Sequence, residues 1–226
     1  MVENIKVGFF DSGVGGRTIH DAFHALCPEV ETVYLADSAN CPYGNKPREE
    51  IIRLSENCVK KLLRQGAKVI VVACNTATAA AIDYLRERYP TVPFVGLEPA
   101  VKPAALKSKS GIVAVLATEG TFNGRLYRET KARFAKDVTV LTAVADEFVA
   151  LVEKYGPEVP DGIDEIDRAV AAKLKPLLDA GADRIVLGCT HFPHLRPAME
   201  RYAAGRAKII DSTGAVVRRI LDLING

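Results

Sequence analysis

Short apolar runs alternate with longer amphipathic segments along most of the chain. The first run, residues 5–10, ends at a glycine-rich turn of residues 11–16, and a helix is expected to begin near Arg17. Further strands are expected at residues 32–36, 69–73, 112–117, 138–143 and 185–187, and helices at residues 48–65, 76–89, 124–134, 146–154, 164–178 and 215–224. Strands of nearly continuous apolar residues that alternate with helices are typical of parallel sheets covered on both faces.

One stretch of the sequence occurs twice. Residues 65–76 (Gln-Gly-Ala-Lys-Val-Ile-Val-Val-Ala-Cys-Asn-Thr) align without gaps on residues 180–191 (Ala-Gly-Ala-Asp-Arg-Ile-Val-Leu-Gly-Cys-Thr-His). In each copy a helix ends at Gly-Ala, a buried strand follows, and a cysteine, Cys74 or Cys189, stands at the carboxyl end of that strand. The repeat predicts an α/β fold of two pseudo-symmetric parallel-sheet domains. If these domains face each other across a central cleft, one of the two cysteines stands on each side of it.

The domain boundary is expected near residue 98, where a Pro- and Lys-rich stretch interrupts the alternation. The first domain is predicted to comprise residues 1–97 and 210–226 and to carry Cys74. The second domain is predicted to comprise residues 98–209 and to carry Cys189.

The two repeated cysteines are candidates for catalysis. Ligands of open α/β sheets bind outside the carboxyl ends of the strands, so Cys74 and Cys189 would flank one ligand if the two domains face each other. Free cysteines are often buried in cores, but a core position does not need the polar residues that follow these two, namely Asn75, Thr76, Thr190 and His191. Two facing thiols suit the inversion of a stereocentre, because a thiolate removes a proton from one face while a thiol supplies one to the other.

A reactive thiolate needs a neighbouring group that lowers its pKa or accepts its proton. His191, two residues after Cys189, is the candidate on that side. Asp11, at the end of the first strand, is the candidate beside Cys74.

The turn of residues 11–16 reads Asp-Ser-Gly-Val-Gly-Gly and lacks the patterns of nucleotide-binding loops. A dinucleotide fingerprint requires glycine where Thr18 stands, and no Lys-Ser/Thr pair ends the turn as in a phosphate-binding loop. The backbone N–H groups of such a turn can still hold an anion such as a carboxylate. The alternative interpretation is a plain tight turn.

The composition excludes several classes of protein. The 226 residues include 30 Lys and Arg against 28 Asp and Glu, a net charge of +2, so no nucleic-acid binding is expected. Apolar runs are far shorter than the roughly 20 residues of a membrane span, so no membrane partner is expected. The N-terminal residues show no secretory pattern and the number of cysteines, five, is odd, so we expect free thiols in the cytoplasm. The cysteines and histidines lack zinc-finger spacing, and no metal site is predicted.

Motifs spread over nearly the whole chain resemble the glutamate racemase family of the aspartate/glutamate racemase superfamily. They are Phe10-Asp11-Ser12-Gly13-Val14-Gly15-Gly16, Asp37-Ser38 with Pro42-Tyr43-Gly44, Ala73-Cys74-Asn75-Thr76-Ala77-Thr78, Leu97-Glu98-Pro99, Thr118-Glu119-Gly120-Thr121, Leu151-Val152-Glu153 and Gly188-Cys189-Thr190-His191-Phe192-Pro193. The Thr-His pair after the second cysteine is similar to the glutamate branch rather than to typical aspartate racemases. Departures from the family pattern occur at Arg17, Asn40, Ala117 and His194.

The resemblance implies a cofactor-independent racemase that interconverts L- and D-glutamate, supplies D-glutamate for peptidoglycan, uses neither pyridoxal phosphate nor metal, and forms a homodimer. It implies Cys74 and Cys189 as the acid/base thiols, assisted by Asp11, Glu153 and His191. The implied substrate contacts are Asp11, Ser12, Pro42, Tyr43, Gly44, Asn75, Thr76, Thr118, Thr121, Thr190 and His191.

Two alternative functions stay open at this point. The first is racemisation of aspartate or another acidic amino acid, because pocket volume depends on loops. The second is a binding protein that captures an acidic amino acid or a partner protein without turnover, although the presence of both cysteines argues against it. Of the remaining cysteines, Cys27 and Cys58 are interpreted as structural, and Cys41 is not assigned a substrate contact.

Overall fold

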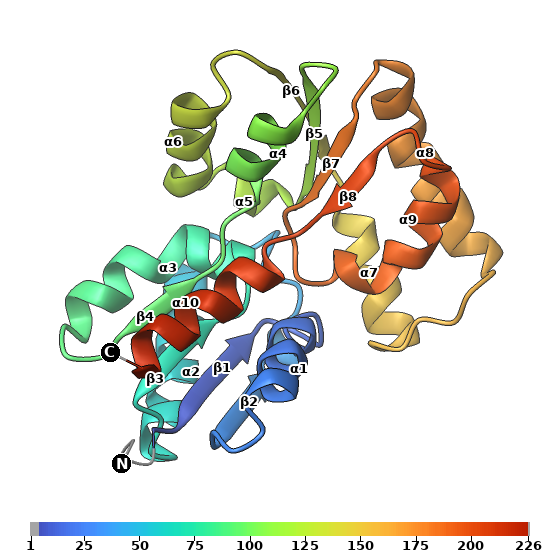
Figure 1. Cartoon of the computed structure of the whole chain (residues 1–226). Coiled ribbons are helices and arrows are strands. Elements are labelled where there is room, and N and C mark those ends of the chain that lie inside the picture. The colour runs from blue at the N-terminus through green and yellow to red at the C-terminus, as the bar shows by residue number, and fades with distance from the viewer. Residues whose placement is uncertain (1–4, 226) are drawn as a thin grey trace.

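The computed structural model describes residues 5–225 and contains two four-stranded parallel sheets (Figure 1). Residues 1–4 and 226, which belong to the predicted first domain and include the start of the segment considered for a secretory signal, lie outside the described residues. The first sheet has the order β2-β1-β3-β4 and consists of β1 (Val7–Asp11), β2 (Thr32–Ala36), β3 (Val69–Val72) and β4 (Phe94–Gly96). The second has the order β6-β5-β7-β8 and consists of β5 (Ile112–Ala117), β6 (Thr139–Val144), β7 (Arg184–Leu187) and β8 (Lys208–Ile210). The equal strand orders confirm the predicted α/β fold of two similar halves.

Helices cover both faces of each sheet. They are α1 (Arg17–Leu26), α2 (Arg48–Arg64), α3 (Asn75–Arg88), α4 (Val101–Lys107), α5 (Glu119–Phe122), α6 (Arg125–Phe134), α7 (Asp146–Tyr155), α8 (Asp164–Asp179), α9 (Arg196–Ala203) and α10 (Thr213–Asn225). We call β1–β4 with α1, α2, α3 and α10 the first lobe, and β5–β8 with α4–α9 the second lobe. The helix α10 packs against α1 of the first lobe.

The continuous apolar character of the strands follows from burial on two sides. In β1, Phe9 shares a core cluster with Phe23 of α1 and Ile220 of α10. Its neighbour Phe10 points to the opposite face and shares a cluster with Leu62 of α2. Because successive side chains of a strand point to opposite faces, a strand with helices on both sides needs apolar residues at every position.

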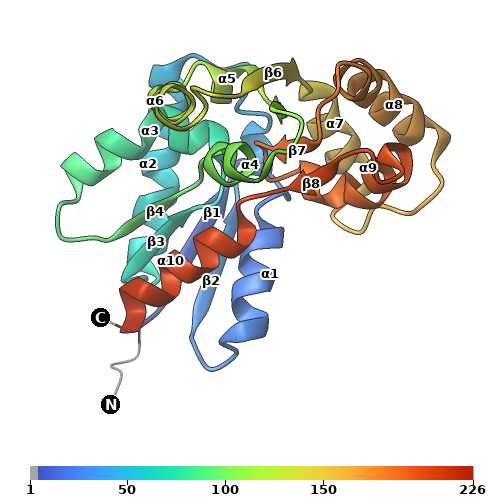
Figure 2. The same cartoon turned by 45° about the horizontal axis from the view of Figure 1, so that its top comes forward.

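The second lobe repeats this arrangement. Leu116 of β5 shares a cluster with Phe148 of α7 and Leu174 of α8. Val115, on the other face of the same strand, shares a cluster with Val101 of α4. Figure 2 shows α4 and α6 on one side of the second sheet, with α7, α8 and α9 on the other.

Five helices and strands were not expected from the sequence, namely α4, α5, α9, β4 and β8. The Pro- and Lys-rich stretch after residue 98 contains the helix α4, because Val101 and Ala104 bury an apolar side against β5 while its lysines stay exposed. The strands β4 and β8 were not expected, since three residues are too few to show a periodic pattern.

Within the described residues, no helix has both the length and the apolar character that crossing a bilayer requires.

Candidate active site between the lobes

The carboxyl ends of the central strands meet at the interface of the two lobes. Asp11 ends β1, Cys74 directly precedes α3, and Cys189 follows β7. The Thr190 hydroxyl donates to Asp11 Oδ2 across the interface (3.3 Å), and the Val14 N–H donates to Glu153 Oε1 (2.9 Å). The fold thus brings the residues beside both repeated cysteines into one hydrogen-bonded region.

Cys74 occupies the N-cap position of α3 and is almost fully buried. Its Sγ accepts a hydrogen bond from the Ala77 N–H (3.4 Å) and lies 3.5 Å from Ser12 Oγ. Burial, followed by the negative charge of Asp11, raises the pKa of Cys74, and the contacts with Ser12 and Ala77 only partly oppose this. These surroundings therefore favour the protonated thiol, which is the form that can donate a proton.

Asp11 is fully buried beside this thiol. Its carboxylate accepts hydrogen bonds from the backbone N–H groups of Ser12 (2.8 Å) and Gly16 (2.7 Å). Burial nevertheless raises the pKa of Asp11, although the hydrogen bonds and the nearby His191 work against it. A carboxylate with a raised pKa accepts a proton from a thiol more readily than an ordinary aspartate does.

Cys189 has a different neighbourhood. Its Sγ lies 3.8 Å from His191 Nδ1, and His191 Nε2 lies 2.6 Å from Glu153 Oε1. Burial alone would lower the pKa of His191, but hydrogen bonding with Cys189, Cys41 and Glu153 raises it well above its ordinary value. Cys189 therefore lies beside an imidazole that is itself paired with a carboxylate, whereas the neighbours of Cys74 are Ser12 and Asp11.

Glu153 holds this imidazole in place. Partial burial alone would raise the pKa of Glu153, but the hydrogen bonds with His191 and with the Val14 N–H lower it overall. The carboxylate therefore stays charged beside the imidazole. It also ties α7 of the second lobe to the glycine-rich turn of the first. Gly13 leaves the space for the Glu153 carboxylate, and Gly15 leaves the space for His191.

Hydroxyl and amide groups from both lobes also meet at the interface. Thr76 Oγ1 lies 2.9 Å from Thr118 Oγ1, which lies 3.0 Å from Thr121 Oγ1. The amide nitrogen of Asn75 is buried and has no hydrogen-bond partner among the described residues. An unpaired buried donor is costly, so this amide is a candidate to bind a ligand oxygen.

The loop of residues 42–44 approaches the same interface from the first lobe. Tyr43 is buried, and its hydroxyl donates to Asp37 Oδ2 (2.6 Å). Pro42 is exposed, and a Cβ on Gly44 would lie 3.4 Å from the side chain of Thr118. We therefore expect this loop to meet a ligand through its backbone rather than through the tyrosine hydroxyl.

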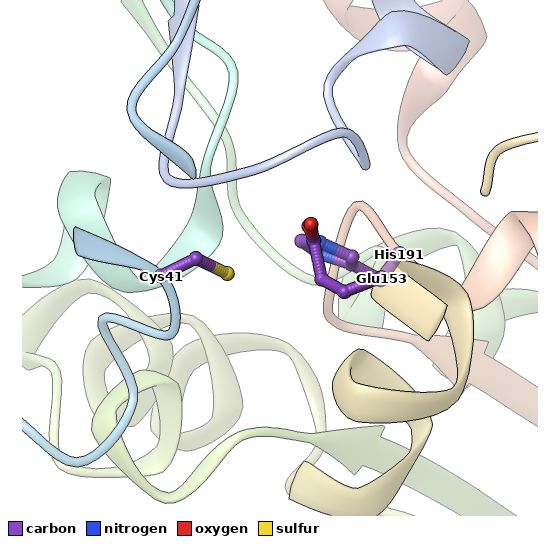
Figure 3. A group of neighbouring side chains, drawn as sticks. All are labelled: Cys41, Glu153 and His191. Atoms are coloured by element: carbon purple, nitrogen blue, oxygen red, sulfur yellow. The ribbon is translucent and has the colours of Figure 1, made fainter. Parts of the chain in front are cut away.

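Two residues without an assigned site role also lie at the interface. Cys41 lies beside Glu153 and His191, and potential ligand atoms of all three are within 4.8 Å of one another (Figure 3). His194 donates from Nδ1 to the Pro157 carbonyl (2.8 Å), and its Nε2 lies 3.1 Å from Thr18 Oγ1. For Cys41 the available signal was its position next to the Pro42-Tyr43-Gly44 motif.

Cavities at the interface are unequal in size. The cavity bordered by Cys189, Thr190 and Asn75 has a volume of about 10 Å³, room for about one water molecule. A cavity of about 670 Å³ opens beside Gly44 and Gly120, and the charged side chains of Arg48, Asp83 and Arg125 are among its lining. The lobe interface is therefore closely packed beside Cys189 and open to a larger cavity beside Gly44 and Gly120.

Comparison with known proteins finds relatives along nearly the whole chain. The family model for Asp/Glu/Hydantoin racemase matches residues 17–220. A curated glutamate racemase from Herpetosiphon aurantiacus is 44% identical over 218 residues, which cover 96% of this chain and 84% of that protein.

Solved structures give the same result. Escherichia coli glutamate racemase in complex with L-glutamate and the activator UDP-MurNAc-ala matches with a TM-score of 0.88 at 34% identity, covering 98% of this chain and 83% of that chain. Glutamate racemase from Francisella tularensis in complex with D-glutamate matches with a TM-score of 0.83 at 26% identity, covering 98% and 81%. The sequence and the fold of this chain are thus both similar to those of glutamate racemases.

Proposed function

The chain belongs to the Asp/Glu/hydantoin racemase family, and we propose that it is a glutamate racemase in which Cys74 and Cys189 exchange the α-proton of the substrate. The observation that carries this proposal is the equivalent placement of the two cysteines at strand ends of opposite lobes, in one buried interface. A racemase is an isomerase, so no group is added to the substrate or removed from it.

The surroundings of the two thiols support a proton relay. Starting from L-glutamate, the Cys189 thiolate, stabilised by His191, removes the α-proton. The Cys74 thiol then donates a proton to the opposite face of the α-carbon, which yields D-glutamate. Cys189 is now a thiol and Cys74 a thiolate, so the reverse reaction uses the same groups with exchanged roles.

Donors around the thiols would bind the two substrate carboxylates. The unpaired amide of Asn75 and the hydroxyls of Thr76 and Thr118 are neutral donors at the same interface. We assign substrate binding to these groups together with Ser12, Thr121, Thr190 and the backbone of residues 42–44. The cavity that borders Cys189 and Asn75 has room for only about one water, so we propose that the lobes separate to admit an amino acid.

The direct test is the circular dichroism of L-glutamate incubated with the purified protein. We expect the signal to decay to zero without added pyridoxal phosphate and after treatment with a chelator. A flat trace would support a binding protein instead, and activity that a chelator abolished and zinc restored would contradict a metal-independent reaction. Parallel incubations with L-aspartate test the alternative substrate, since a faster decay there would reassign the substrate.

Charged residues beside the thiols are expected to tune proton transfer rather than hold the substrate. We expect Asp11→Asn, Glu153→Gln and His191→Gln each to lower kcat by about tenfold, the equivalent of about one pKa unit in a thiol, with smaller changes in KM. Steady-state kinetics in both directions measure this. Glu29→Gln is the matched control, because Glu29 is exposed. Unchanged kcat in all three variants would remove these residues from the mechanism.

We also propose that the enzyme works in the cytoplasm as a homodimer and supplies D-glutamate for peptidoglycan. The support is the family membership, together with a composition that favours free thiols in a reducing compartment.

A further inference from the structure

Three side chains at the interface form a group that the proton relay does not use as a whole (Figure 3). The Cys41 thiol, a carboxylate oxygen of Glu153 and a ring nitrogen of His191 lie within 4.8 Å of one another. Cys41 comes from the segment before α2 in the first lobe, whereas Glu153 belongs to α7 and His191 follows β7 in the second lobe. The group therefore connects the two lobes.

We propose that Cys41, Glu153 and His191 form a binding site for a zinc ion, and that zinc bound there inhibits the enzyme. Thiolate, imidazole and carboxylate are the three side-chain ligands that zinc prefers. At bond lengths of about 2.0–2.3 Å and tetrahedral angles, ligand atoms are about 3.3–3.6 Å apart, so small side-chain movements would complete the site. The fourth position would be open to water or to a substrate carboxylate.

The backbone of Gly13 borders the three side chains, and solvent reaches one of them. Gly13 has no side chain, and a Cβ at this position would clash with the Glu153 carboxylate and lie 3.0 Å from Cys41 Sγ. The Glu153 side chain is 26% exposed, whereas that of His191 is 2% exposed. The site is thus bounded by protein on the His191 side and open to solvent on the side of Cys41 and Glu153.

Zinc binding would act on the reaction in two ways. The ion would replace the hydrogen bond between His191 and Glu153, so the imidazole would lose the contact that holds it 3.8 Å from Cys189 Sγ. The bond to Cys41 would also hold the lobes together and prevent the separation that substrate entry requires. Inhibition rests on the proposed function, whereas zinc binding does not.

Calorimetric titration with zinc chloride tests the site without reference to activity. We expect one ion per chain in the wild type, and binding weaker by about tenfold or more in Cys41→Ala. Cys27→Ala, which removes a cysteine at the end of α1, is the matched control and should bind as the wild type does. Cys189→Ala should also keep the site, and its loss there would assign zinc to the repeated cysteines and overturn the proposal.

Cobalt gives a spectroscopic test that a merely destabilised variant would not mimic. Cobalt(II) in the site should produce thiolate-to-metal absorption in the near ultraviolet in the wild type and in Cys189→Ala, and none in folded Cys41→Ala. Equal absorption in Cys41→Ala and the wild type would show that another thiol binds the metal.

The rate of racemisation gives the functional test. We expect zinc to inhibit the wild type, a chelator to restore its rate, and Cys41→Ala to need about tenfold more zinc or higher for the same fractional inhibition. Each rate is compared with that of the same variant without metal, so a change in basal activity does not affect the result. Equal sensitivity in both proteins would overturn the proposal. If the protein proved inactive towards amino acids, calorimetry and cobalt absorption would still decide on the site.

Discussion

Replacing either Cys74 or Cys189 with serine is expected to lower glutamate racemisation by about a hundredfold or more, the low end for loss of a general acid or base. A hydroxyl has nearly the shape of a thiol but releases its proton far less readily, so the substitution removes the chemistry and preserves the packing. The assay is the circular dichroism decay of each glutamate enantiomer. The double variant should be little slower than the single ones, because the two groups act as a unit.

The control for these variants is Cys27→Ser, which changes a cysteine at the end of α1, away from the lobe interface. It should racemise glutamate at nearly the wild-type rate. Wild-type activity in Cys189→Ser would make the two-thiol mechanism wrong.

Adding one methyl group at Gly15 is expected to lower kcat by about a hundredfold, the cost of displacing reacting groups by roughly 1 Å. A Cβ at this position would lie 2.7 Å from the backbone nitrogen of His191 and 2.6 Å from its Nδ1. A rotamer change cannot relieve contact with a backbone atom, so Gly15→Ala must push His191 away from the first lobe. Since Gly15 does not have positive φ, the substitution acts through this contact rather than through backbone strain.

Steady-state kinetics and a melting curve together check this effect. Gly214→Ala is the matched control, because the added methyl group there meets only the end of the Arg218 side chain at 3.5 Å. Full activity in Gly15→Ala would show that the interface does not need this close approach.

Much of the fold could be predicted from the sequence because its signals are local. Strands buried on both faces are apolar throughout, and the repeated Gly-Ala-strand-Cys pattern places Cys74 and Cys189 at equivalent strand ends before any contact is known. The short elements α4, α5, α9, β4 and β8 gave weaker signals, since a helix or strand of a few residues has no clear period.

The site was less predictable where it depends on how the lobes pack. Glu153 had no local pattern and entered only through the resemblance to a family, yet the structure places its carboxylate on the Val14 N–H and on His191. Cys41 lies far from both Glu153 and His191 along the chain, so no spacing rule connects the three residues. Their proximity is a property of the interface and becomes visible only in three dimensions.

The unlike surroundings of the two thiols have a thermodynamic consequence. L- and D-glutamate are mirror images with equal free energies in water, so their equilibrium constant is unity and the Haldane relation makes kcat/KM identical in the two directions. Asp11 and Ser12 beside Cys74, and His191 beside Cys189, can therefore differ in chemistry without favouring either product. Their asymmetry can appear only in how each direction divides between kcat and KM. A substitution of His191 must consequently lower kcat/KM for both enantiomers by the same factor, although the imidazole touches only one of the thiols.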